Sequence, residues 1–287
     1  MDDINIGCPT MYRMPFYIGD AVGNNAFSYD ERKCRKIRVA SLVQDEIAHA
    51  RTAPEFAFVE IDERNLEQKN VGLENFIRQK NCFLFDNHNH SYYFYKQFLR
   101  ENNLKLLGFL HIDQHKDMRK PSKSLAEYSG EIKSLEEEFE KLGIDALQLN
   151  RIAADYIAWV GDEEKAKSRF DEEALDFLYT NRVLNVGNFI MPLLEENRIS
   201  SLAIIDSQYQ MDNFSKSDFP KDYVLDLDLD FFSKDMDYIS YERRLDFVCE
   251  AAKDAKAILI ASSPYFISFD DAKRALDEIF ETGLRGI

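Results

Sequence analysis

The feature that most constrains this chain is an apolar segment that runs directly into metal-binding side chains. Residues 106–112 have the pattern of a buried strand, and Asp113, His115 and Asp117 follow at alternate positions. Alternate residues of an extended chain point to the same side. Two carboxylates and an imidazole on one side repel, or are costly to bury, unless a cation lies between them. The two interpretations are a divalent metal site and a polar loop with satisfied hydrogen bonds.

Two further segments have the same design and favour the metal site. Residues 83–91 run from an apolar strand into His88 and His90. Residues 223–232 alternate Leu with Asp226, Asp228 and Asp230, which predicts a strand in the centre of a sheet with three carboxylates on one face. A calcium loop of the EF-hand type needs Gly at its sixth position and polar residues between the acids, so it is excluded. An edge strand with a solvated acidic face is the remaining alternative.

The order of the elements predicts an α/β fold with a mainly parallel central sheet in three layers, α/β/α. Strand, polar loop, helix and strand follow one another through residues 82–112, as in parallel sheets. The metal-binding segments lie at the carboxyl ends of such strands, where sites form. Other strands are expected at 55–61, 201–205 and 257–261, and helices at 43–50, 73–80, 91–99, 188–196, 241–252 and 268–280. Ser91 is expected to cap the helix through Leu99.

Residues 1–287 are expected to form a single domain, interrupted by a helical insertion at about 120–180. Within the insertion, apolar residues recur at helical spacing in 125–142, 152–159 and 172–179. The insertion can be a lid or peptide-recognition surface over the site, or a helical layer that covers one face of the sheet.

Charge and composition exclude several classes of partner. The net charge of −16 argues against nucleic acid and against anionic membrane surfaces, and it suits a cationic ligand. The sequence contains no run of about twenty apolar residues, so no membrane span is expected. The N-terminus has no signal-peptide pattern. The four cysteines lack CxxC spacing, which predicts reduced thiols in a cytoplasmic protein.

The three segments, in their order along the chain, resemble the metal-binding motifs of the arginase and histone-deacetylase superfamily. Asn89-His90-Ser91 is similar to the end of Gly-Gly-Asp-His-Ser, residues 113–117 match Asp-x-His-x-Asp, and residues 226–230 are similar to Ser-x-Asp-x-Asp. Asp-Asn-His-Asn-His and Leu-Asp-Leu-Asp-Phe-Phe together resemble a divergent arginase-like family that includes peptide arginases. The resemblance covers roughly residues 80 to 270 and implies an arginase-like fold.

The resemblance implies two Mn²⁺ ions per chain and six protein ligands. These are His90 and Asp117 on one ion, His115 and Asp230 on the other, and Asp113 and Asp228 bridging both. Asp226 then takes the place of the motif's Ser; the alternative register makes Asp226 and Asp228 the ligands. Two ions about 3.5–4 Å apart activate a water between them, and Asp117 is the candidate for passing its proton to the leaving amine.

Other residues near the motifs have less defined expected roles. His88, two residues from His90, can be the alternative ligand, a partner that orients a ligand, or the proton shuttle. The nearest match to the superfamily's Gly-Asn-x-His-Gly segment is at 187–190, with Ile190 in place of the His. Asn188 of this segment is a candidate substrate contact. His111 is expected to be a hydrogen-bonded core histidine.

The resemblance predicts a hydrolase that converts arginine side chains to ornithine and releases urea. After Asp117, the sequence Met118-Arg119-Lys120-Pro121 lacks the segment that holds the carboxylate and amine of a free amino acid. The expected substrate is therefore an arginine-containing peptide, as in the maturation of ribosomally made peptides. The alternatives are another amide hydrolase of the deacetylase type, and a non-catalytic protein that binds a cationic peptide.

Overall fold

A central sheet of seven strands organises the computed structural model, which describes residues 9–18, 37–61 and 67–282. Listed by position across the sheet, the strands are β3 (Leu42–Gln44), β6 (Phe76–Gln79), β7 (Cys82–Phe85), β11 (Ala257–Ala261), β10 (Tyr223–Asp228), β8 (Leu107–Ile112) and β9 (Ile199–Ile205). The order differs from the chain order, so crossover connections link most neighbours.

The sheet is parallel except at one pair of strands. β6 and β7 form an antiparallel hairpin, and the other neighbouring strands of the sheet pair in parallel. The hairpin turns at Lys80, whose φ of 53° lies in the left-handed region. The predicted α/β class with a mainly parallel sheet is confirmed.

The strands that carry the polar motifs are buried on both faces. β7, β8, β10 and β11 are buried along their whole length. β10 lies between β8 and β11, with Asp226 beside His111 on one side and Leu259 on the other. The apolar residues of these strands stabilise the sheet, as is usual where helices cover both faces. The central position predicted for the acidic strand is confirmed.

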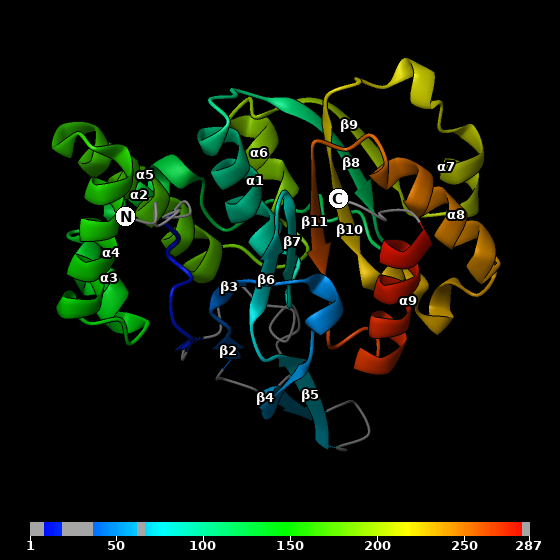
Figure 1. Cartoon of the computed structure of the whole chain (residues 1–287), viewed down its shortest axis with the longest axis horizontal. Helices are drawn as coiled ribbons and strands as arrows, with labels where there is room; N and C mark the ends of the chain where they lie inside the picture. The colour runs from blue at the N-terminus through cyan, green and yellow to red at the C-terminus, as the bar shows by residue number, and fades with distance from the viewer. Residues whose placement is uncertain (1–8, 19–36, 62–66, 283–287) are drawn as a thin grey trace, which may run out of the picture.

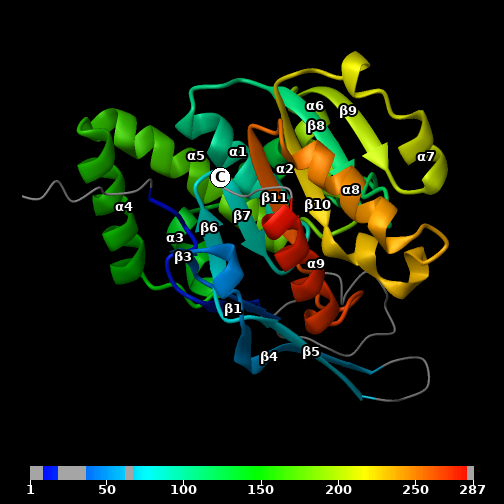
Figure 2. The ribbon, with the colours of Figure 1, turned by 45° about the vertical axis from the view of Figure 1, so that its right-hand side comes forward.

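Helices lie on both sides of the sheet, an arrangement compatible with three α/β/α layers (Figure 1). α1 (His90–Glu101) and α6 (Ile190–Glu195) lie on one side, and α8 (Tyr241–Ala252) and α9 (Phe269–Thr282) on the other. Turning the molecule keeps α8 and α9 together in front of the strands (Figure 2). α7 (Gln208–Asn213) follows the edge strand β9 and packs against it. No helix in the described ranges is long and apolar enough to cross a membrane.

The segment predicted as a helical insertion contains four helices. They are α2 (Leu125–Glu131), α3 (Leu135–Lys141), α4 (Ala146–Val160) and α5 (Glu163–Arg182). The continuous pattern at 125–142 is broken because Ile132 is extended and the Ser134 side chain caps a new helix by accepting from the Glu137 N–H. α5 packs against α1, and α4 against α5 (Figure 2), so these helices extend the layer around α1.

Two predicted helices are wrong. Residues 73–80 contain strand β6, because Phe76 and Ile77 are buried in the sheet and pairing with β7 outweighs local helix preference. Residues 43–50 contain β3 and a short 3-10 turn, Ile47–His49, instead of an α-helix. The other described strands form two antiparallel pairs, β1 (Phe16–Ile18) with β2 (Ile37–Val39) and β4 (Thr52–Ile61) with β5 (Glu67–Leu73). Of the cysteines, Cys82 and Cys249 are buried free thiols, and Cys8 and Cys34 lie outside the described residues.

Candidate metal centre

The polar segments converge at one edge of the sheet, where parallel strands end. β7 ends at Phe85, β8 at Ile112 and β10 at Asp228. The three strands point the same way, because each is joined to its neighbours through parallel pairs with β11 or with each other. Side chains that follow these strand ends in the sequence therefore meet in space, as expected for a site in a parallel sheet.

The first part of the site is a fully buried histidine facing three carboxylates. The Nδ1 atom of His88 lies 3.1 Å from Asp113 Oδ2, 3.3 Å from Asp117 Oδ2 and 3.1 Å from Asp228 Oδ2. One nitrogen carries at most one hydrogen, so it can donate to only one of these oxygens. A divalent ion among these oxygens would offset the negative charge of the three carboxylates. His88, Asp113 and Asp228 can each offer one ligand atom to such an ion.

The second part of the site is centred on His115, whose side chain is 41% exposed. Its Nδ1 lies 3.3 Å from Asp113 Oδ1 and 3.2 Å from Asp230 Oδ2. Asp230 Oδ2 is buried and makes no hydrogen bond, and a buried carboxylate oxygen in that state is costly without a cation. Phe266 packs beside the His115 ring, with centroids 5.0 Å apart. His115 is thus the solvent-facing member of the site.

Asp113 links the two parts, because one oxygen faces His88 and the other faces His115. When two sets of metal ligands have one carboxylate in common, the arrangement is typical of a site for two neighbouring ions. The donor set contains only imidazoles and carboxylates, which suit hard or borderline divalent ions such as Mn²⁺ or Zn²⁺. The chemistry of the donors and the buried Asp230 oxygen both fit such ions.

The pKa values show that protons offset part of the negative charge of this cluster. Burial lowers the pKa of His115, but Asp113 and Asp230 outweigh this effect and raise it to about 11. Burial and repulsion by Asp113 raise the pKa of Asp117 to about 7. Burial and the neighbouring Asp228 hold the pKa of Asp230 well above its usual value. Cations bound at the site would take over the role of these protons.

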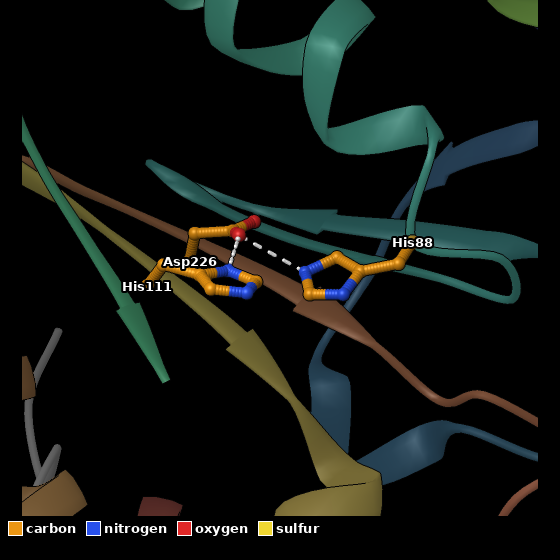
Figure 3. Close-up of side chains that lie close together, drawn as sticks. All are labelled: His88, His111 and Asp226. Carbon is orange, nitrogen blue, oxygen red and sulfur yellow. Dashed lines mark hydrogen bonds and ion pairs between the residues drawn. The ribbon is translucent and has the colours of Figure 1, made fainter. Parts of the chain in front are cut away.

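Asp226 faces the Nε2 atom of His88 (Figure 3), whereas the three carboxylates lie at Nδ1. Its Oδ2 is 3.0 Å from His88 Nε2 and 2.7 Å from His111 Nδ1, and its Oδ1 accepts a hydrogen bond from Ser91. Burial raises the pKa of Asp226, but His88 and His111 outweigh this and hold it below its usual value. The predicted core histidine, His111, is fully buried and hydrogen-bonded, and it also lies near Asp113.

Two residues at the site have backbone angles in the left-handed region. They are Asp117, with φ 49°, and Ser263, with φ 42°, and neither is a glycine. Ser263 follows β11 and donates from Oγ to Asp228 Oδ2 at 2.5 Å. Its N–H donates to the carbonyl of Asp86. The turn after β11 therefore fixes the Asp228 carboxylate, which was an unexpected function for this serine.

His90 lies apart from the site, although the resemblance assigns it a ligand role. It begins α1 and packs against Phe76, with its Nδ1 2.8 Å from the hydroxyl of Tyr12. Asn181 donates to the same hydroxyl, so the Tyr12 hydrogen points to His90. Burial lowers the pKa of His90 to about 3. The chain leaves extended geometry after Phe85, so His88 and His90 point to different surroundings and His88 is the histidine that meets the carboxylates.

The segment 187–190 reaches the site through Phe189 instead of Asn188. The Phe189 ring packs on His88, with centroids 4.7 Å apart. Asn188 is buried, and its Oδ1 accepts from the N–H of Asn185 within a turn. A side chain at Gly187 would lie 2.0 Å from the Arg119 guanidinium, so glycine lets this turn approach the loop after Asp117.

Sequence reasoning missed the residues that orient the ligands. Ser91 does not cap α1, because its hydroxyl donates to Asp226. Ser263 and Phe189 have no metal-binding chemistry of their own, so no motif marks them. The sequence marks Ser91, Ser263 and Phe189 only by their positions, because each lies next to a turn at the carboxyl edge of the sheet. The remaining candidate ligands are brought together as pairs or triads: Asp113, His115, Asp117, Asp228 and Asp230.

Known proteins do not extend this description. Comparison with models of protein families, with characterised protein sequences and with solved structures gives no match. The arginase-like family therefore stays a prediction from the motifs, and the functional interpretation depends on the geometry of the site.

Proposed function

We propose that this chain is a binuclear metal hydrolase that converts arginine side chains in a peptide to ornithine and urea. The observation that carries the proposal is the shared carboxylate of Asp113, which faces His88 through one oxygen and His115 through the other. The resemblance of the motifs to those of arginases supplies the reaction type.

Each ion has its own set of candidate ligands. His88 and Asp117 would hold the inner ion, His115 and Asp230 the outer ion, and Asp113 and Asp228 both. In this assignment His88 replaces His90 as the imidazole ligand. Two bound divalent ions would supply a water of lowered pKa and positive charge opposite the developing negative charge.

The residues of the chain then define where a substrate can enter and where protons can be held. His115 is the exposed ligand, so an arginine side chain would approach past His115 and Phe266. The carboxylates of the buried site attract a guanidinium cation. Asp117 Oδ2 lies 3.3 Å from His88 Nδ1, and by the resemblance to arginases this carboxylate would take the proton of the water and pass it to the leaving amine.

The proposal is tested by measuring urea release from three substrates with protein loaded with Mn²⁺. The substrates are free arginine, a blocked arginine amide and a longer arginyl peptide. We expect kcat/KM for the peptide to exceed that for free arginine at least about tenfold, roughly 1.4 kcal/mol of transition-state binding. Binding energy from the rest of the peptide would position the side chain.

The controls separate the reaction from contamination and from other activities. Asp113→Ala removes the shared carboxylate and should release no urea. Acid release from an acyl-lysine peptide, without urea, would replace the proposal with a deacetylase-type reaction. Faster turnover of free arginine than of the peptide would contradict the peptide substrate, and no turnover of any substrate would contradict the hydrolase.

A further inference from the structure

We propose that Asp226 is a positioning residue that holds His88 in the orientation needed to bind the inner ion, and that it is not itself a ligand. This inference rests on the proposed metal centre. The starting observation is that one buried carboxylate contacts three hydrogen-bond donors on three different elements: Ser91 in α1, His88 in the loop before it and His111 in β8.

The contacts define where the hydrogens are. An ionised carboxylate only accepts hydrogen bonds. Asp226 Oδ2 lies 3.0 Å from His88 Nε2 and 2.7 Å from His111 Nδ1, so each of these nitrogens carries a hydrogen that points to it (Figure 3). Asp226 Oδ1 receives the Ser91 hydroxyl. The side chain is fully buried, so no water competes for these contacts.

The consequence for His88 is a fixed assignment of its two nitrogens. With one hydrogen held on Nε2, Nδ1 is the nitrogen that can give up its hydrogen and offer a lone pair to an ion among Asp113, Asp117 and Asp228. A lone pair among three carboxylates is favourable only when a cation lies between them. Histidine ligands of metals commonly donate their other N–H to a carboxylate, which sets the ring orientation and increases the basicity of the ligand.

Packing prevents the His88 ring from turning away from this orientation. His111 stacks on one side of His88, with centroids 5.2 Å apart and an interplanar angle of 27°. Phe189 packs against His88 at 4.7 Å. The Nε2 atom of His111 lies 3.2 Å from the carbonyl oxygen of His115, so Asp226 also connects the inner and outer parts of the site through His111.

The hydrogen-bond partners argue against Asp226 as a ligand. Both of its oxygens are already occupied by donors, Oδ1 by Ser91 and Oδ2 by His88 and His111, and an ion at this carboxylate would displace those hydrogens. Asp226 is also two residues before Asp228 in β10, deeper in the sheet by about 6.6 Å at 3.3 Å per residue. Asp226 takes the place of the Ser in the arginase motif, and its depth in the sheet suits a residue that orients a ligand.

The first test uses the wild-type protein and nuclear magnetic resonance of its histidine N–H groups. With five histidines in the chain, each signal can be assigned by replacing single histidines. We expect slowly exchanging N–H signals from His88 Nε2 and His111 Nδ1 in the metal-free protein. Both should persist after two equivalents of diamagnetic Zn²⁺ are added, because the ion occupies His88 Nδ1. Loss of both signals on loading would show that Asp226 and the two nitrogens bind the ion, and would overturn the inference.

The second test compares two buried carboxylates by the same substitution. Asp86 is as buried as Asp226, but it accepts from the N–H of Leu73 and the hydroxyl of Ser262 and contacts no histidine. We expect Asp226→Ala to lower the affinity for one of two Zn²⁺ ions about 10–100-fold. Asp86→Ala should change it less than about threefold. Equal effects of the two substitutions, or wild-type affinity in Asp226→Ala, would overturn the inference.

Failure of the proposed function gives a different result from failure of this inference. If the wild-type protein binds no divalent ion, the proposed function is wrong, and the metal-free spectra still decide the role of Asp226. N–H signals that are present in wild type and Asp86→Ala but lost in folded Asp226→Ala support positioning. Their absence from the wild-type protein overturns it, whether or not the variants fold.

Discussion

Two buried clusters of charge differ in how their carboxylates are compensated. The first, called here the α1–α5 ion network, contains Lys96, Arg100, Glu173, Asp176 and Glu196. Lys96 lies 2.6 Å from both Asp176 and Glu196, and Arg100 hydrogen-bonds to Asp176. Tyr93 donates to Glu173 at 2.5 Å. Full cations of the protein therefore face the acids of the network.

The candidate metal centre has more carboxylates and weaker cations of its own. In the described part of the chain, the ion pairs of Asp113, Asp117, Asp226, Asp228 and Asp230 are made with histidines. A histidine is cationic only while it holds a second proton. The lysine and arginine of the network pair with its acids without a ligand, and the network joins α1 to α5. In place of lysine and arginine, the acids of the candidate metal centre face histidines, a donor set that could hold a metal ion.

The largest effect on the difference between the two clusters is expected from removing the carboxylate of Asp113, which the two parts of the metal centre share. Asp113→Ala should lower the affinity for Mn²⁺ at least about 10³-fold, roughly 4 kcal/mol, because both ions lose a ligand. Titration calorimetry and metal analysis after dialysis measure this loss. The wild-type protein should gain about 2.7 kcal/mol of unfolding free energy for each bound ion at a metal concentration 100 times Kd. The same gain in Asp113→Ala would contradict the assignment.

The converse experiment removes a cation from the α1–α5 ion network. Lys96→Met leaves Asp176 and Glu196 without their shared ammonium and should lower the unfolding free energy by about 3 kcal/mol. Metal stoichiometry of the folded variant should stay at the wild-type value, because the network contacts none of the proposed ligands. Denaturant unfolding with and without Mn²⁺ checks both expectations. Loss of metal from a folded Lys96→Met variant would mean that the two clusters are coupled.

A narrower test compares two acids of the alternating strand. Asp230→Ser removes a proposed ligand of the outer ion and should leave one ion per chain. Asp226→Ser restores the arginase motif and should still bind two ions at saturating metal, with affinity for one ion lowered about 10–100-fold. Metal analysis at saturation separates the two results. If Asp226→Ser lost an ion and Asp230→Ser kept both, Asp226 and Asp228 would be the ligands.

The smallest expected effect is a pH dependence of the α1–α5 ion network. Burial raises the pKa of Asp176, but Lys96 and Arg100 outweigh it and hold the pKa below the usual 3.8. A depressed folded-state pKa stabilises the protein above the unfolded-state pKa, and this stabilisation is lost as the pH falls through the folded-state value.

The loss can be measured as the difference in unfolding free energy between wild type and Asp176→Asn, both with chelator. This difference should be constant from pH 7 to about pH 5 and should shrink below about pH 4, by at most about 1.4 kcal/mol per unit. A difference that did not change with pH would show that Asp176 does not titrate as described.

Hydrophobicity and strand order predicted most of the sheet and its active edge. The runs at 82–85, 107–112, 223–228 and 257–261 are rich in apolar residues and buried over their full length, so burial in a parallel sheet was the favourable solution for each. Ligands directly after such strands had to meet at one edge. Asp228 and Asp230 each contact a histidine at this edge, and their choice as ligands over Asp226 and Asp228 stays a prediction.

The prediction was least successful where the backbone turns. The alternation of His88 and His90 assumes an extended chain, but Asn87 to Asn89 form a turn and α1 begins at His90. The segment predicted as a helix at 73–80 contains strand β6, which pairs with β7 and with β3, and local sequence does not reveal these partners. The roles of Ser91, Ser263 and Phe189 depend on contacts between distant segments, which local sequence patterns do not contain.

The position of β11 in the sheet has a consequence for how the protein is made. β11, Ala257–Ala261, lies between β7 and β10, and its last residues lead to Ser263, which holds Asp228. A nascent chain that has emerged only to residue 240 carries the six proposed ligands but has a gap in the middle of its sheet. Capture of the proposed ions would therefore follow the emergence of β11 from the ribosome. Pairing over such long sequence separations is slow, so metal loading should report the last step of folding.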